Sequence, residues 1–227
     1  MPLHTDRAFE EQLGQLRTAV LEMGGLVEEQ IGQAVRALIQ RDEALARATI
    51  ERDHTVNRFD VEIDDLSLKL LALRQPAARD LRLITTALKI TTDLERIGDM
   101  ATHIAERAIE LAGELPIKPY IDIPRMADVA RDMLRRSLDA FVREDTELAL
   151  GVCLADDMID QLHEQLFREL LSYMVENPAT VSRAMRLLFV SKYLERVGDH
   201  ATNIAEMVIF MVKGRSIRHL DKLPREL

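Results

Sequence analysis

Residues 94–106 read LERIGDMATHIAE, and residues 194–206 read LERVGDHATNIAE. Ten of the thirteen positions are identical at an offset of 100 residues. Further upstream, an offset of 103 residues relates Asp53 to Asp156. A recurrence over this distance indicates an internal duplication, in which each copy takes up about half of the chain.

The composition favours helices in both copies. Leu, Ala, Met, Glu and Arg are abundant, Trp is absent and aromatic residues make up only 4%. The abundant types are good helix formers, whereas strands are rich in β-branched and aromatic residues. Apolar residues recur at helical spacing in six segments, 5–40, 42–74, 77–112, 125–142, 145–176 and 179–213. Because three antiparallel helices can close into a bundle, we predict an all-α protein of two tandem, pseudo-symmetric three-helix bundles.

Prolines mark the division between the two bundles. Pro116, Pro119 and Pro124 fall within nine residues, and proline is disfavoured inside helices. We predict four parts, namely a first bundle at 1–113, a Pro-rich joint at 114–124, a second bundle at 125–213 and a tail at 214–227. Helices of about 30 residues are roughly 45 Å long, so the molecule should be elongated.

Charge and cysteine content exclude several classes of protein. A net charge of −9 argues against a nucleic-acid partner and against direct binding to an anionic membrane, since both bind clustered Lys and Arg. The single Cys153 cannot form an intramolecular disulfide and fits a reducing compartment; we expect it to be buried as a small hydrophobe. We see no secretory signal and no apolar run of about 18 residues. These features predict a soluble, cytoplasmic protein.

Acidic residues form a second stripe on the helices, separate from the apolar face. The stripe is made of pairs spaced i, i+4, which lie about 5–6 Å apart at Cβ on one side of a helix. Four such pairs occur, namely Asp53 with Asn57, Glu95 with Asp99, Asp156 with Asp160, and Glu195 with Asp199. Antiparallel packing would bring two pairs together in each bundle and supply four or more oxygen ligands to a hard or borderline cation. Because the stripe lies off the core, the site should be open on the bundle surface.

A simpler interpretation is that these acids are solvated. Arg96 and Arg196 follow in positions where they can pair with the acids at i, i+3. His103 and His200 do not occupy equivalent positions in the two copies, and we expect both to be solvated. Arg79 and Arg82, in the stretch ARDLR, can bind an anion or simply line an exposed helix face.

No motif for catalysis is evident. The sequence has no P-loop, no Rossmann glycine pattern and no Gly-x-Ser-x-Gly. Ser–His–Asp and Cys–His sets with supporting spacing are also missing. We therefore expect a protein that is not an enzyme, with no catalytic residues and no organic cofactor.

The two segments LERIGD and LERVGDHATNIAE, with QPAARDLRLITTALKI before the first, resemble the duplicated signature of the PhoU family. The resemblance extends from the first helix to about Lys213. It implies two three-helix bundles related by pseudo-twofold symmetry, with multinuclear metal clusters on their surface held by Glu/Asp-x-x-x-Asp motifs. Asn57 departs from that motif, so the site of the first bundle should be weaker or hold fewer ions. The metal, whether iron, zinc, manganese or magnesium, is left open.

The resemblance also implies a function. PhoU proteins are understood to be non-enzymatic regulators of phosphate uptake and phosphate-starvation signalling. They link the ATPase of the Pst phosphate transporter to a sensor histidine kinase and repress starvation genes in high phosphate. A homodimer that reaches the membrane only through its partners is expected. Two alternatives stay open, a metal-dependent phosphohydrolase that activates water at the carboxylates and a purely structural helical scaffold.

Overall fold

The computed structural model describes residues 4–73, 76–215 and 217. Helices take up 90% of these residues, and no strand occurs among them, which confirms the all-α prediction. The first repeat consists of α1 (His4–Gln40), α2 (Glu43–Leu73) and α3 (Ala78–Ala112). The second repeat consists of α4 (Asp122–Arg143), α5 (Thr146–Cys153), α6 (Asp156–Glu176), the short 3₁₀ helix η1 (Pro178–Thr180) and α7 (Val181–Lys213).

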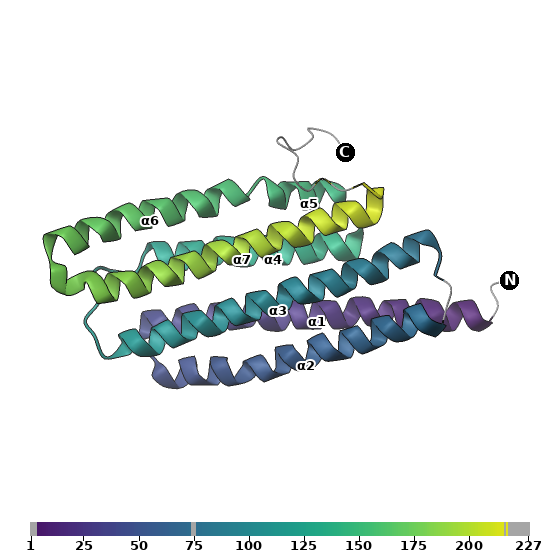
Figure 1. The fold of residues 1–227 in the computed structure, drawn as a ribbon, viewed down its shortest axis with the longest axis horizontal. Helices are drawn as coiled ribbons and strands as arrows, with labels where there is room; N and C mark the ends of the chain where they lie inside the picture. Colours follow the sequence, from purple (N-terminus) through teal and green to yellow (C-terminus); the bar gives the residue numbers. More distant parts are fainter. Residues whose placement is uncertain (1–3, 74–75, 216, 218–227) are drawn as a thin grey trace.

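Each repeat closes as a three-helix bundle, with α5 and α6 together taking the place of α2. The helices run along the long axis of an elongated molecule (Figure 1). Helices α3 and α7 lie side by side in the middle, and α1 also packs against α4, while α2 and α6 occupy opposite edges. The two bundles therefore share a long lateral contact.

The core is aliphatic and follows the helical period. On α1, Leu16, Val20 and Val27 are completely buried, and each such side chain contributes about 1.5–3 kcal/mol through the hydrophobic effect. The contact between the bundles is close, because a Cβ at Gly24 would overlap Leu138 Cδ1 on α4. Glycine at this position lets α1 and α4 approach each other.

Two helix boundaries differ from the sequence prediction. The predicted helix 145–176 is wrong as a single element, since it breaks into α5 and α6 after Cys153. At the break the Ala155 N–H donates to Val152 O, three residues back, which is the tighter pattern typical of helix ends. Helix α4 begins at Asp122, before the predicted start at Arg125, because Pro124 lies in its first turn, where no intrahelical N–H is needed.

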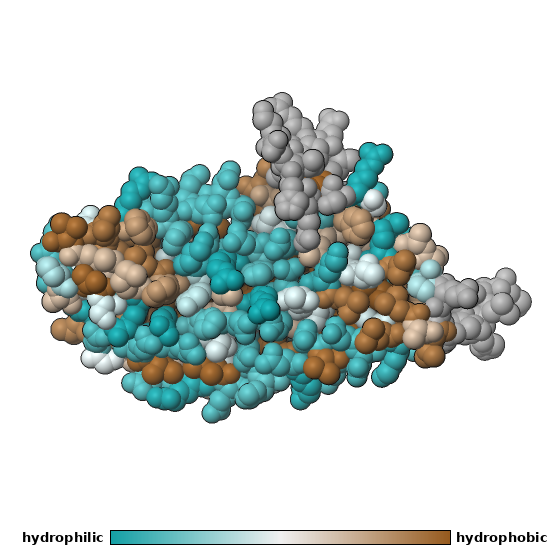
Figure 2. Space-filling model, in the orientation of Figure 1, coloured by the Kyte–Doolittle hydropathy of each residue, from teal (hydrophilic) through white to brown (hydrophobic). Residues whose placement is uncertain are grey.

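None of the described helices is long and apolar enough to cross a membrane. Most of the predicted tail at 214–227 lies outside the described residues, and Ile217 within it is buried. Hydrophilic side chains cover much of the middle of the face shown in Figure 2, whereas apolar side chains gather where α6 ends and α7 begins.

Candidate functional site

The acidic pairs of each repeat meet where its second and third long helices pack together. In the first repeat α2 carries Asp53 and Asn57, and the neighbouring α3 carries Glu95 and Asp99. We call these four residues the first acidic cluster. In the second repeat α6 and α7 bring together the second acidic cluster, which consists of Asp156, Asp160, Glu195 and Asp199.

A glycine on the third helix makes room for a carboxylate from its neighbour in both repeats. An added Cβ at Gly98 would lie 3.2 Å from Asp53 Oδ1, and one at Gly198 would lie 3.5 Å from Asp156 Oδ1. The same Cβ at Gly198 would be 2.9 Å from Ile159 Cγ2, which is too close for an undistorted contact. The predicted meeting of the two stripes is thus observed, and the small residue at this point allows it.

Burial and mutual repulsion raise the pKa values of carboxylates in the second acidic cluster. Asp156 is half-buried, and burial followed by the negative charges of Asp199 and Asp160 raises its pKa to about 6. Burial and the charge of Glu195 also raise the pKa values of Asp160 and Asp199. Asp156 Oδ1 is buried without a hydrogen-bond partner among the described residues. This oxygen and its acidic surroundings would be stabilised by a cation.

The first acidic cluster is less perturbed, since one of its members is an amide. Asn57 Nδ2 donates a hydrogen bond to Asp53 Oδ2 over 3.0 Å, which partly offsets the rise in the pKa of Asp53 caused by burial. Arg96 lies 3.5 Å from both Glu95 and Asp99. Arg96 therefore pairs with these acids, as the simpler interpretation of the sequence expected, although both distances are too long for strong ion pairs.

The donor set fits a hard cation in type and charge, since it consists of carboxylate and amide oxygens. As the side chains lie, no three His, Cys, Asp or Glu residues in the described part of the chain are close enough to hold a metal ion. Binding would require at least one carboxylate to turn. Glu195 is already engaged, because Lys192 Nζ lies 2.6 Å from its Oε1. The role of the eight residues as ligands stays a prediction.

His103 and His200 are only partly exposed, and each contacts a residue of the other bundle, so the expectation that both are solvated is wrong. His200 Nδ1 lies 2.8 Å from Asp93 Oδ1 of α3, and the ring of His103 stacks on Tyr193 of α7 with a centroid distance of 5.1 Å. Both contacts form because α3 and α7 pack against each other. Cys153 is buried, as predicted, and burial raises the pKa of its thiol to about 12, so it is a poor nucleophile.

One constellation was missed from the sequence. Glu144, at the end of α4, accepts hydrogen bonds from Arg17 of α1 over 2.8 Å and from Arg79 of α3 over 2.6 Å. Arg82 is also engaged, since its Nε donates to Met211 O over 2.9 Å. The sequence had indicated Arg79 as a possible anion-binding residue, but it gave no signal for Arg17 or Glu144; at an offset of 103 residues the position of Glu144 corresponds to Arg41, a residue of opposite charge.

Comparison with known proteins agrees with both the repeat and the fold. The model of the PhoU domain matches residues 20–108 and again residues 123–208. The chain is 45% identical over 219 residues to the phosphate-specific transport system accessory protein PhoU homolog of Pseudomonas putida, covering 96% of this chain and 85% of that protein. A homolog of the same name in Aquifex aeolicus is 42% identical over 209 residues, covering 92% of this chain and 95% of that protein.

Solved structures give the same answer. The crystal structure of PhoU from Pseudomonas aeruginosa matches with a TM-score of 0.87 at 44% identity, covering 91% of this chain and 100% of that one. The phosphate transport system regulatory protein PhoU from Streptococcus pneumoniae matches with a TM-score of 0.86 at 28% identity, over 92% of this chain and 99% of that one. Two matched domains, two bundles and a signature present twice lead to one conclusion. The chain belongs to the PhoU family.

Proposed function

We propose that the chain is a non-enzymatic regulator of phosphate uptake and phosphate-starvation signalling. It works in the cytoplasm as a homodimer that links the ATPase of the Pst transporter to a sensor histidine kinase, and it keeps starvation genes repressed when phosphate is plentiful. The observation that carries the proposal is the family match over both repeats. The relatives, which are named as accessory and regulatory proteins of phosphate transport, support it.

Metal ions are part of this proposal. The first acidic cluster and the second acidic cluster would each hold divalent or trivalent ions through their oxygens, with Asn57 contributing an amide oxygen. The bound charge would relieve the repulsion that raises the pKa of Asp156 and would fix α6 against α7. The repetition of the cluster in both bundles supports this role, because repelling acids within one helix turn are otherwise slightly destabilising.

An exposed apolar patch supports the role as an adaptor. Near the α6–α7 turn, six large apolar side chains are 40–76% exposed, which we call the apolar end. It consists of Phe167, Leu171, Val175, Val181, Met185 and Phe189. In the first repeat Asp64, Thr85 and Lys89 stand at the positions of Phe167, Met185 and Phe189. Clustered exposed apolar groups mark protein-binding surfaces, and this one belongs to the second bundle.

The test is carried out in the organism that encodes the protein. Deleting the gene should leave a phosphate-starvation reporter active in high phosphate, and the wild-type gene should restore repression. The tagged protein, captured from phosphate-replete cells, should bring down the transporter ATPase or the sensor kinase. Normal repression in the deletion strain would overturn the proposal, and metal-dependent phosphatase turnover by the purified protein would favour the hydrolase instead.

A further inference from the structure

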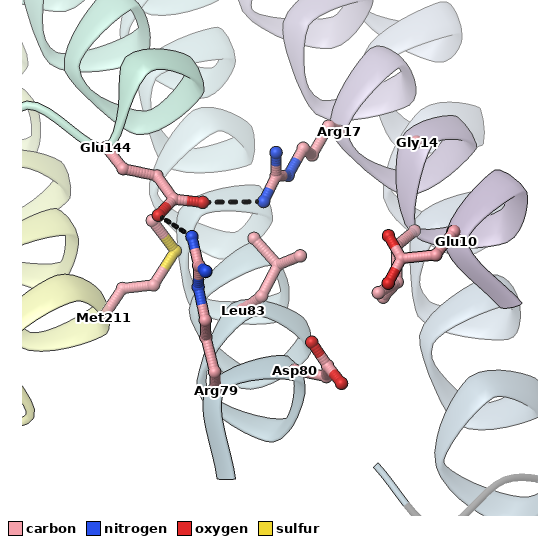
Figure 3. A pocket seen from close by; sticks show the side chains of 9 residues that line it. Glu10, Gly14, Arg17, Arg79, Asp80, Leu83, Glu144 and Met211 are labelled. Atoms are coloured by element: carbon pink, nitrogen blue, oxygen red, sulfur yellow. Dashed lines mark hydrogen bonds and ion pairs between the residues drawn. The ribbon is translucent and has the colours of Figure 1, made fainter. Parts of the chain in front are cut away.

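A hollow of about 310 Å³ lies at the end of the molecule where α1, α3, α4 and α7 come together. Leu13, Leu83 and Met211 are buried and give it an apolar lining. The polar side of the hollow contains the ion-pair cluster of Glu144 with Arg17 and Arg79 (Figure 3). This site is separate from both acidic clusters.

The two arginines hold one carboxylate between them. Arg17 Nη2 donates to Glu144 Oε1 over 2.8 Å, and Arg79 Nη2 donates to Glu144 Oε2 over 2.6 Å. The arginines come from α1 and α3 of the first bundle, whereas Glu144 comes from the second bundle. Each oxygen of one oxyanion is thus bound by a different guanidinium group, an arrangement that either a carboxylate or a phosphate group can adopt.

The surroundings of this cluster favour an exchangeable anion over a fixed structural pair. Arg79 lies in the first turn of α3, where the helix dipole disfavours a cation unless an anion is bound nearby. Its side chain is 72% exposed, so an incoming anion can reach it. Glu144 has a left-handed backbone with φ of 54°, a conformation that is unfavourable for a residue with a Cβ.

Comparison of the two repeats shows that the left-handed backbone at Glu144 does not require an acidic residue. Arg41 stands at the equivalent position of the first repeat, with nearly the same backbone φ of 57°. Its guanidinium group donates to Ala112 O within its own bundle. The turn therefore accepts either charge, and the acid at Glu144 is matched to the two arginines rather than to the turn.

We propose that Arg17 and Arg79 form a binding site for a phosphate-type oxyanion, with the Glu144 carboxylate as its internal competitor. Across the hollow lie Glu10 and Asp80, whose negative charges weaken anion binding, so the site responds only when the anion is abundant. An anion that binds the two guanidinium groups displaces the Glu144 carboxylate, and this breaks one contact between the bundles. The proposal rests on the proposed function only in choosing phosphate as the biological oxyanion.

The experiment measures phosphate binding to the purified full-length chain by isothermal titration calorimetry. A chelator is present throughout, so that phosphate cannot bind through metal ions at the acidic clusters. Glu144→Gln removes the competing charge at nearly constant size and should bind phosphate at least tenfold more tightly than wild type. Glu144→Gly serves as a second variant, because glycine adopts the left-handed conformation readily. Circular dichroism verifies that both variants are folded.

The tighter phosphate binding expected of the Glu144 variants must depend on Arg17 and Arg79. Adding Arg79→Gln to Glu144→Gln should cancel the tighter binding, and Arg17→Gln should do the same. Arg168→Gln is the matched control, since Arg168 is 69% exposed and pairs with one acid on α6; it should leave affinity unchanged. Acetate should bind more weakly than phosphate to Glu144→Gln, because it has fewer oxygens to share between two guanidinium groups.

A second titration, with glycerol phosphate, identifies the source of the oxyanion. Tighter binding of inorganic phosphate points to the free ion, and tighter binding of the ester points to a phosphorylated group, and either result supports the site. Equal phosphate affinity in wild type and in both Glu144 variants would overturn the inference, as would binding that survives loss of both arginines. Either failure would leave the regulator proposal standing if the deletion strain is derepressed.

Discussion

His200 Nδ1 lies 2.8 Å from Asp93 Oδ1 across the contact between α3 and α7. The position equivalent to Asp93 in the second repeat is Tyr193, which stacks on His103 of α3. The two repeats therefore use different chemistry at related places of their shared interface. One half of the contact is a polar pair and the other half is an aromatic stack.

We expect Asp93→Ala to weaken the contact between the bundles. Asp93 is buried, and its loss would leave His200 without its partner and remove the weaker contact of Asn203 at 3.4 Å. An unsatisfied buried polar group costs about 1–3 kcal/mol, and urea unfolding should show a loss of that size. Asp128→Ala is the control, because Asp128 is exposed. An unchanged unfolding midpoint for Asp93→Ala would show that the pair contributes nothing.

Asp156→Asn should stabilise the metal-free protein at neutral pH. The folded-state pKa of Asp156 is raised to about 6 from 3.8, so its ionised form is unfavourable in the folded state at pH 7. Allowing for its partial exposure, the gain in unfolding free energy should be about 1 kcal/mol. The gain should shrink as the pH falls through 6 and vanish below about 4, where the carboxyl group is protonated in both states. A gain that persists at pH 4 would contradict this cause.

Gly198→Ala should destabilise the second bundle. A Cβ there would be 2.9 Å from Ile159 Cγ2, and the branched side chain cannot move away freely, so overpacking of about 1–3 kcal/mol should outweigh the gain in helix propensity of about 1 kcal/mol. Gly25→Ala is the matched control, because nothing lies within 4 Å of the Cβ position there. Thermal unfolding should show opposite shifts for the two variants.

We expect the amount of bound metal to change when residues of the acidic clusters are replaced. The double substitution Glu195→Ala with Asp199→Ala should remove metal from the second bundle and leave helix content unchanged, since neither side chain belongs to the buried core. Asn57→Asp should increase metal binding by the first bundle, because it restores the missing negative charge. Elemental analysis of the purified proteins measures both effects. A double variant that keeps the full metal content of wild type would rule out these ligands.

The apolar end should be needed for partner capture. Phe167 and Phe189 are 46% and 45% exposed, so replacing both with Ser removes apolar surface without opening a cavity in the core. Capture of the transporter ATPase or the sensor kinase from cells should fall at least tenfold, with circular dichroism unchanged. The control is Leu68→Ser in the first bundle, which is 60% exposed. Equal losses in both variants would show that the apolar end has no special role.

The fold could be read from the sequence because its signals are local and periodic. Apolar residues at helical spacing predicted six helical segments, five of which form single α-helices in the structure, and the repeated segment with LERIGD and LERVGD identified the two bundles. The i, i+4 spacing placed Glu195 and Asp199 on one side of a helix. Asp53 and Asp156 occupy equivalent positions of the two repeats, and this indicated which helix would face the acidic pair of the third helix. Each of these inferences needs only the geometry of a single helix and the rule that apolar faces are buried.

The tertiary structure decided everything that depends on how one helix meets another. Sequence alone could not show that Asp93 meets His200, because that contact joins residues 107 positions apart and depends on the rotation of α3 against α7. The break between α5 and α6 was missed because its residues are compatible with a continuous helix. The pairing of Glu144 with Arg17 and Arg79 was hidden for the same reason, since it requires three helix ends to meet at one point. Local propensity sets the elements, and only close packing of complete helices determines which side chains share a site.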